Sequence, residues 1–363
     1  MGATAASAQG GRVAVDLGTL PGGTGAATVA INEAGTIAGM AVAADGTARP
    51  VRWTSGGVID ALATPAGTQF GTTVDVNESD TVAGYTQDAS VGVHGALWDR
   101  SGVRTDLLAL PGGWGSEPAD LNDAGTVVGS SHAASGDTHA VRWNPGGVPT
   151  DLGTLPGGTV SEALAVNEQG MVVGLALTAS FEQHSALWDA DGNITELVAP
   201  GGGGDTYPMD INEQGEVIGQ AQFMDGTYHA VRWSSSGVPT DLGTIDGFGD
   251  SNALAINDLG VVVGDSQDRP VRWNAAGELT ELPTLPGYFT GAANEINGQG
   301  IVAGTAGDFI TGQQAVRWNA AGKVSALGNL PGGTGSNVND INDKGVIVGN
   351  ARTADGRTHA VRW

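Results

Sequence analysis

The chain has 363 residues with 61 glycines, 15 prolines and no cysteine, and its formal net charge of -24 includes only two lysines. Without cysteine, disulfides and thiolate metal sites are excluded, and such an acidic chain disfavours nucleic acid and anionic lipid as partners. An apolar fraction of 40% is too high for a disordered chain, and no apolar run reaches the roughly 18 to 20 residues needed to insert into a membrane.

The N-terminal residues 1–12 are rich in alanine, glycine and serine and are expected to form a flexible leader, either a signal-peptide remnant or an added start. Residues 13–20 (VAVDLGTL) follow and read as a β-strand. This strand stands before the first complete repeat of the chain. It therefore has no partner next to it in the sequence.

From residue 13 onward the sequence repeats with a period of 45 residues, marked by one tryptophan per repeat. Successive tryptophans are 45 residues apart except for one interval of 40. The five missing residues fall between Gly264 and Trp273, so one loop is shortened. The eight tryptophans are Trp53, Trp98, Trp143, Trp188, Trp233, Trp273, Trp318 and Trp363.

Each repeat contains four short β-like segments, which are clear at 161–166 (SEALAV), 171–176 (MVVGLA), 229–233 (HAVRW) and 240–245 (TDLGTI). A tight turn that begins with asparagine, such as Asn167, joins the first two segments. A glycine-rich crossing, Leu-Pro-Gly-Gly in its fullest form, leads to the next repeat. In such a meander the crossings and the loops after each second strand share one face, here named the crossing face, and the tight turns share the opposite turn face.

These units predict an all-β fold, an eight-bladed β-propeller of four-stranded antiparallel blades that occupies residues 13–363 as one domain. The last repeat ends on its third strand, residues 360–363, and lacks a fourth. We therefore expect the unpaired strand 13–20 to pair with 360–363 and to close the ring.

The repeat resembles the bacterial extracellular HAF repeat, whose units read DLGTLGG, then AINxxGxVVG, then HAFxW. The corresponding segments here are 151–158 (DLGTLPGG), 255–264 (AINDLGVVVG) and 139–143 (HAVRW), and the match runs from about residue 13 to 363. The chain has HAV where the family name has HAF. The resemblance implies an exported, extracellular bacterial repeat protein and carries over no catalytic motif.

Polar residues also recur at fixed repeat positions. Histidines lie four residues before five of the tryptophans, in five different repeats, so they are expected to be structural, and we predict no metal site and no cofactor. Arginines before the tryptophans are expected to pair with the acids that open the fourth strands, with Arg362 and Asp16 meeting where the ring closes.

Aromatic residues outside the repeat pattern fall on the crossing face. We predict that they contact a ligand, with plugging of the channel mouth as the alternative. The predicted ligand-binding residues are Phe70, Trp114, Tyr207, Phe248, Tyr288 and Phe289, and Phe181, Phe223 and Phe309 lie on loops of the same face.

The strand nearest the propeller axis carries an acid two residues before the turn asparagine in five repeats. These acids predict an acidic collar around the central channel, which is either solvated or binds a cation or a cationic ligand. The collar residues are Asp75, Asp120, Asp210, Glu295 and Asp340.

No linear catalytic signature is present. The sequence therefore favours a secreted, monomeric module that binds a small molecule, a carbohydrate or a cell-envelope glycan. The alternatives are a lyase or glycoside hydrolase that uses carboxylates at the channel mouth together with His132, and a structural scaffold.

Overall fold

The computed structural model describes residues 12–89, 92–308 and 312–363, and within these residues the chain is all-β. The predicted leader lies outside the described residues except for Arg12. The described part contains one short 3₁₀ turn, η1 (Ile245–Gly247). None of its helices is long and apolar enough to cross a membrane.

After β1 (Val15–Asp16), the strands follow the sequence repeats in groups of four. Repeats 1 to 4 comprise β2 (Gly25–Ile31), β3 (Ile37–Val42), β4 (Ala48–Trp53), β5 (Ile59–Ala61); β6 (Thr68–Val76), β7 (Val82–Asp88), β8 (Gly92–Trp98), β9 (Arg104–Asp106); β10 (Trp114–Leu121), β11 (Val127–His132), β12 (Thr138–Trp143), β13 (Pro149–Gly153); and β14 (Ser161–Val166), β15 (Val172–Leu177), β16 (Gln183–Trp188), β17 (Ile194–Leu197).

Repeats 5 to 8 comprise β18 (Thr206–Ile211), β19 (Val217–Gln222), β20 (Tyr228–Trp233), β21 (Pro239–Asp241); β22 (Ser251–Ile256), β23 (Val262–Ser266), β24 (Arg269–Trp273), β25 (Leu279–Glu281); β26 (Thr290–Ile296), β27 (Val302–Asp308), β28 (Gly312–Trp318), β29 (Val324–Ala326); and β30 (Ser336–Ile341), β31 (Ile347–Arg352), β32 (Thr358–Arg362). Repeat 8 has three strands of its own.

The strands predicted at 13–20 and 240–245 are shorter in the structure, for the same reason. In both, an aspartate side chain accepts the backbone N–H two residues later, as Asp16 does from Gly18 and Asp241 does from Gly243, each at 2.8 Å. Both glycines have a left-handed backbone, with φ of 75° and 73°. This local turn bends the chain out of the strand and starts the crossing.

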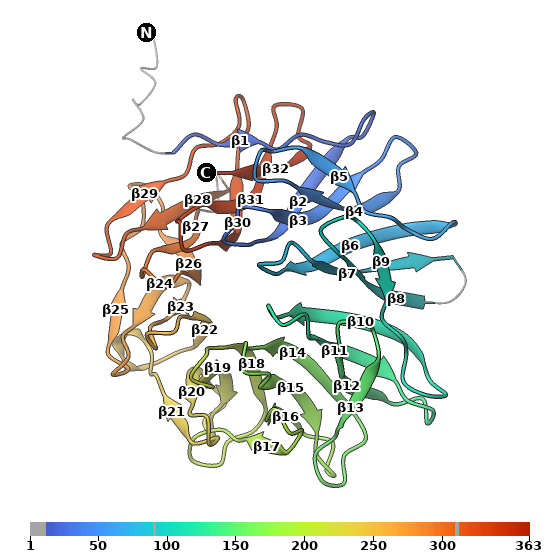
Figure 1. Ribbon diagram of the computed structural model, residues 1–363. Helices are drawn as coiled ribbons and strands as arrows, with labels where there is room; N and C mark the ends of the chain where they lie inside the picture. Colours follow the sequence, from blue (N-terminus) through green and yellow to red (C-terminus); the bar gives the residue numbers. More distant parts are fainter. Residues whose placement is uncertain (1–11, 90–91, 309–311) are drawn as a thin grey trace.

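The strands form seven sheets arranged around a central axis (Figure 1). Six sheets have four strands, and one has eight because a single parallel bridge between Ser116 and His94 joins the strands of repeats 2 and 3. The prediction of eight separate blades is therefore wrong at the level of the sheets, and strand pairing does not run continuously around the molecule. Within each repeat the strands are antiparallel neighbours, as expected.

The N-terminal segment lies beside the last strand of the chain (Figure 1). Val15 pairs with Arg362 and Asp16 with Val361, antiparallel. Leu17 extends the contact, since its N–H donates to the oxygen of Ala360 at 3.0 Å. The predicted pairing of the N-terminal strand with the C-terminal strand is confirmed over these residues.

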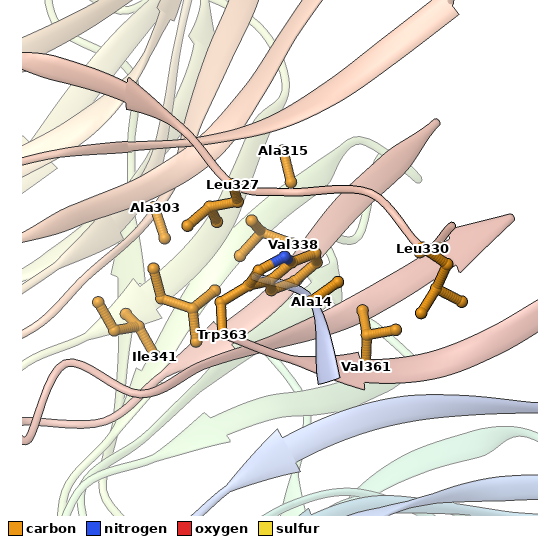
Figure 2. Packing of buried hydrophobic residues seen from close by; sticks show 11 residues of the cluster. Ala14, Ala303, Ala315, Leu327, Leu330, Val338, Ile341, Val361 and Trp363 are labelled. Atoms are coloured by element: carbon orange, nitrogen blue, oxygen red, sulfur yellow. The ribbon is translucent and has the colours of Figure 1, made fainter. Parts of the chain in front are cut away.

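The hydrophobic core is divided among the interfaces between successive repeats. In one cluster, Val128 and Ala140 of repeat 3 pack with Val172 and Trp188 of repeat 4. Figure 2 shows the cluster around Trp363, to which the N-terminal segment contributes Ala14. Apart from Trp363, which is 7% exposed, the repeat tryptophans are fully buried. The repeats therefore depend on their neighbours for burial, as expected of a repeat architecture.

The packing around Gly39 shows why glycine recurs at this position of the repeat. A Cβ on Gly39 would lie 2.8 Å from the ring of Trp53 and 2.1 Å from the oxygen of Ala27. The neighbouring strand and the tryptophan ring both occupy the space that a side chain would need. Glycine at this position is therefore a packing requirement of the blade-like unit.

Candidate functional site

On the turn face, the eight turn asparagines form a circle of hydrogen bonds. The side-chain N–H of each one donates to the backbone oxygen of the next, at 2.9 to 3.3 Å, and the last bond returns from Asn342 to Asn32 at 3.0 Å. The side-chain oxygen of each asparagine accepts an N–H in its own turn, as Asn167 does from Met171 at 2.9 Å. The amide N–H and the amide oxygen of each asparagine are therefore both used in structural hydrogen bonds.

The residue after the turn asparagine is acidic in seven repeats and glycine in repeat 7. Each of these carboxylates accepts the backbone N–H of the equivalent residue in the preceding repeat, as Asp343 does from Gly298 at 2.7 Å. The seven acids are Glu33, Glu78, Asp123, Glu168, Glu213, Asp258 and Asp343. The role of this acid in joining repeats was not predicted from the sequence.

The predicted collar acids are half-buried, and three of them also join repeats. Asp120 accepts the N–H of Leu121 at 2.9 Å and that of Val166, in the next repeat, at 2.8 Å. Asp210 and Asp340 accept equivalent pairs of N–H groups at 2.6 to 2.9 Å. In all three cases the next repeat has alanine at the collar position, so the backbone N–H of the residue after the alanine has no acid of its own repeat to bond and donates across the interface.

The other two collar acids, Asp75 and Glu295, precede repeats that carry their own collar acid, and no hydrogen bond joins them to the next backbone. Burial, followed by the charge of Asp120, raises the pKa of Asp75 well above its ordinary value, and Asp75 hydrogen-bonds to Asp120. Burial and the charges of Asp340 and Asp210 raise the pKa of Glu295 in the same way.

Burial also raises the pKa of Asp210 and of Asp340 to about 6, against the lowering effect of their two N–H donors. The collar is thus a mixture of hydrogen-bonded carboxylates and acids that favour the protonated form. Among the described residues, no group of three acidic, histidine or cysteine side chains is arranged to hold a metal ion.

The recurring histidines take the role that was predicted for the arginines. Histidine, not arginine, meets the acid of the fourth strand, as in His139 with Asp151 at 2.8 Å and His359 with Asp16 at 2.8 Å. The arginine reaches further, into the next repeat, where Arg142 donates to the backbone oxygens of Gly170, Asp189 and Ala190. The predicted pairing of Arg362 with Asp16 is therefore wrong, since Arg362 donates to the oxygen of Ser55.

The crossings and the loops after the second strands touch one another, as their shared face requires. A Cβ on Gly22 would lie 3.0 Å from Ala44, and one on Gly157 would lie 2.9 Å from Ala179. In each pair the glycine belongs to a crossing and the alanine to the loop after the second strand of the same repeat. The crossing face is therefore a continuous surface within a repeat.

The predicted aromatic residues are spread over this face and do not gather in one place. Trp114 is 50% exposed and stacks on His132, with ring centroids 4.6 Å apart. Phe248 and Phe289 are exposed, but Tyr288 packs on the core of repeat 7 and so has a structural role.

The two remaining predicted aromatics have neighbours within their own repeats. Phe70 lies 6.1 Å from Tyr85, and Tyr207 lies 6.3 Å from Tyr228, measured between ring centroids. No ring contact between described residues joins two of the six predicted aromatics, which come from five different repeats. Phe309 lies outside the described residues.

A groove of about 910 Å³ lies on the crossing face between repeats 7 and 8. Its side chains are mainly amides and hydroxyls, and one is an arginine. Those of Gln313, Thr334, Asn337 and Arg352 make no hydrogen bond with any described residue. The lining comprises Gly312, Gln313, Thr334, Gly335, Ser336, Asn337, Asn350, Ala351, Arg352 and Thr358.

The wall of this groove includes a glycine, Gly335, at a position that carries a side chain in several other repeats. The equivalent residues of repeats 5 and 6 are Asp205 and Asp250, whose carboxylates accept backbone N–H groups of the preceding repeat at 3.3 and 2.8 Å. At Gly335 no side chain fills the interface. The groove was not predicted, because glycine also occupies this position in repeats 1 and 3, at Gly25 and Gly115, and so does not mark the groove in the sequence.

Glu117 and Glu162 form a second unpredicted feature, on the neighbouring strands β10 and β14. Burial, with a smaller contribution from the charge of Glu117, raises the pKa of Glu162. The same two causes raise the pKa of Tyr85. Glu162, whose pKa is raised, is thus close enough to Glu117 to interact with its charge, and neighbouring acids of this kind can serve in general acid and base catalysis.

The fold and this surface define a class of protein: an all-β repeat protein with a propeller-like arrangement of antiparallel sheets. No family model matches the chain, and no curated protein matches it. Among solved structures it is similar to a puromycin hydrolase, with a TM-score of 0.55 and 14% identity, covering 90% of this chain and 58% of that one.

It is also similar to a puromycin-hydrolysing peptidase of Mycobacterium tuberculosis (TM-score 0.50, 14% identity, 79% of this chain and 50% of that chain) and to a streptogramin B lyase (TM-score 0.46, 11% identity, 96% of both chains). The chain spans 50% to 58% of the length of the two hydrolases. At such identities the likeness concerns the fold alone.

Proposed function

We propose that this protein is a binding module that holds a carbohydrate or cell-envelope glycan on its crossing face. The observation that carries the proposal is the groove of about 910 Å³ between repeats 7 and 8, in which the side chains of Gln313, Thr334 and Asn337 have no partner among the described residues. Amides and hydroxyls donate and accept hydrogen bonds as sugar hydroxyls do. Polar groups that the fold itself leaves unused are available to a ligand.

Exposed aromatics support the same function. Trp114 and Phe289 occupy the same repeat position as Thr334 in the groove, at the start of the innermost strand. Their rings are 50% and 79% exposed, which is unusual for side chains that only pack a core. They offer apolar faces on which further sugar rings could stack.

We also propose that the seven sheets act as eight blades of one closed propeller. The circle of asparagine bonds runs through all eight repeats and returns to its start. β2 contacts β30, β31 and β32, so repeat 1 and repeat 8 are neighbours. A closed arrangement would hold both walls of the groove in fixed positions, as preorganised binding requires.

The glycan function can be tested with the full chain on a glycan array, followed by calorimetry with the best ligand. Replacing both Gln313 and Asn337 with alanine should weaken binding about tenfold or more, because two ligand hydrogen bonds are lost. Gln214→Ala, an exposed amide on the turn face, is the matched control and should change nothing. Absence of binding to any glycan, or equal binding by the double variant, would contradict the proposal.

Export is a further part of the proposal, supported by the resemblance of the repeats to the extracellular HAF repeat. Fractionation of the producing bacterium, with the native N-terminus intact, tests it directly. The protein should be found in the medium or on the cell surface. Recovery from the cytoplasm alone would show that this part is wrong.

Glu117 and Glu162 favour a second candidate function, a glycan-cleaving enzyme. In that case the bound glycan would be shortened, and Glu162→Gln would abolish turnover and preserve binding. Chromatography of each glycan after incubation distinguishes the two functions. The collar acids do not support this candidate, since three of them are occupied by backbone N–H groups.

A further inference from the structure

Repeat 6 is five residues shorter than the others, and the structure shows what the deletion changes. β23 and β24 are joined by only two residues, Gln267 and Asp268, between the paired Ser266 and Arg269. Both linking residues have a left-handed backbone, with φ of 54° and 59°, as a tight two-residue hairpin requires. In repeat 5 the same connection spans residues 222–228. The loop after the second strand therefore projects less far from the crossing face at repeat 6 than at repeat 5.

A cavity of about 310 Å³ lies beside this short turn, between repeats 6 and 7. Asp265 and Asp268 line one side of it, and Thr290, Thr305 and Gln313 line the other. Gln313 also lines the large groove between repeats 7 and 8. The cavity and the groove therefore adjoin across the top of repeat 7.

The two aspartates in the cavity are not neutralised by the rest of the described chain. The side chain of Asp268 has no ion pair or hydrogen bond, and Asp265 is bonded only by the amide of Asn252, at 3.3 Å. The nearest arginine in the sequence, Arg269, is occupied by Asp246 at 3.0 Å and by Glu281 at 3.1 Å.

Two acids on other loops of the crossing face have arginine partners. Asp45 lies 3.4 Å from Arg49, and Asp355 lies 3.2 Å from Arg357. At Asp265, burial raises the pKa of the carboxyl, and the charge of Asp268 adds to the effect. A bound cation between the two side chains would remove this unfavourable interaction.

We propose that the glycan bound by the groove carries a free amino group, whose ammonium binds between Asp265 and Asp268. This inference rests on the proposed function. An ammonium has three N–H donors for two carboxylates, and the neutral amides and hydroxyls beyond Gln313 match the hydroxyls of the following sugars. A de-N-acetylated amino-sugar chain has this combination of groups.

The test compares two glycans of equal length, a glucosamine hexamer and its fully N-acetylated form, by calorimetry with the full chain. The amine form should bind about tenfold more tightly, because a charge-assisted hydrogen bond is stronger than a neutral one. In the variant with Asp265→Asn and Asp268→Asn this preference should disappear, while binding of the acetylated hexamer stays unchanged. Asp191→Asn, an exposed acid on the turn face, is the control for loss of charge and should keep the preference.

A loop graft tests the shortened hairpin itself. Residues 267–268 are replaced with a copy of residues 222–228, which restores the length found in the other seven repeats. The longer loop should cover the cavity and remove the preference for the amine. Circular dichroism checks that the grafted chain folds, and the aspartate double variant keeps the proposal testable if it does not.

The outcomes separate the two levels of the proposal. If neither hexamer nor any other glycan binds, the proposed function is wrong. If both hexamers bind equally, the function stands and the amine-binding site is wrong. The site is also wrong if the double variant keeps the preference for the amine, or if oligolysine binds more tightly than every glycan, which would indicate a cationic peptide as the ligand.

Discussion

The turn face and the crossing face are made by the same repeats but differ in how their polar groups are used. On the turn face the asparagine side chains, and the carboxylates that follow them, bond to backbone groups of a neighbouring repeat. On the crossing face, amides such as Gln313 and carboxylates such as Asp268 have no partner among the described residues. Positions that repeat maintain the fold, and positions that depart from the repeat are available for binding.

The largest change in stability is expected on removal of the N-terminal segment, which supplies the fourth strand of repeat 8. Deleting residues 1–20 should lower the free energy of unfolding by more than about 5 kcal/mol, since it removes the buried Leu17 and several hydrogen bonds. One of these bonds joins the indole N–H of Trp53 to the oxygen of Leu17 at 2.9 Å. Denaturant unfolding measures the change, with deletion of residues 1–11 alone as the control. Equal stability of the two truncated chains would refute closure by this segment.

Two tryptophans sharpen the contrast between the faces. Trp143 is fully buried and its N–H donates to the oxygen of Leu108 at 2.7 Å, whereas Trp114 is 50% exposed. Trp143→Ala should cost about 3–5 kcal/mol, as expected for a large core truncation. Trp114→Ala should cost less than about 1 kcal/mol, as for most surface positions. Thermal and denaturant unfolding test both; similar losses would mean that Trp114 is a packing residue.

These contrasts also show what the sequence could predict. The period of 45 residues, the asparagine turns and the N-terminal pairing followed from residues that recur, because repeated packing demands repeated side chains. The lengths of the fourth strands did not, since the Asp-x-Gly turn at Asp241 overrides the strand pattern. Nor did the count of sheets, which depends on one bridge between Ser116 and His94.

The candidate site was predicted less well, for a physical reason. Sequence reasoning selected aromatics that depart from the repeat, but the six come from five different repeats and do not gather in one place. The groove is lined instead by amides, hydroxyls and a glycine of repeats 7 and 8, and the cavity lies beside a missing loop segment next to Asp268. An absent group leaves little signal in a single sequence, although the shortened repeat itself was recognised.

The collar allows a finer comparison, between an acid that joins repeats and one that does not. Asp120→Asn should lower stability by about 1–3 kcal/mol at neutral pH, because one of the N–H groups of Leu121 and Val166 loses its acceptor. Asp75→Asn should be neutral or stabilising, because Asp75 bonds to no backbone of the next repeat and an amide can still donate to Asp120. A loss at Asp75 equal to that at Asp120 would contradict this division.

The same two variants should differ with pH. An acid whose pKa is higher in the folded than in the unfolded protein binds more protons when folded, so its contribution to stability falls as pH rises above the unfolded value of about 4. For Asp75 this penalty is present at neutral pH and absent near pH 4. Asp75→Asn should therefore stabilise the protein relative to the wild type at pH 7 and have little effect at pH 4. A difference that is constant across this range would show that Asp75 is not buried as described.

The smallest changes in the free energy of unfolding are expected at the recurring charged residues. Here too, a side chain that bonds to the next repeat should contribute more than one that bonds within its own repeat. Arg142→Ala should cost about 1 kcal/mol, because the guanidinium joins three backbone oxygens of the next repeat. His139→Ala should cost less than about 0.5 kcal/mol, since its bond to Asp151 stays within one repeat and near solvent. Denaturant unfolding of the two variants side by side measures the difference. If the histidine variant loses more, then contacts within a repeat, not contacts between repeats, set the stability of this fold.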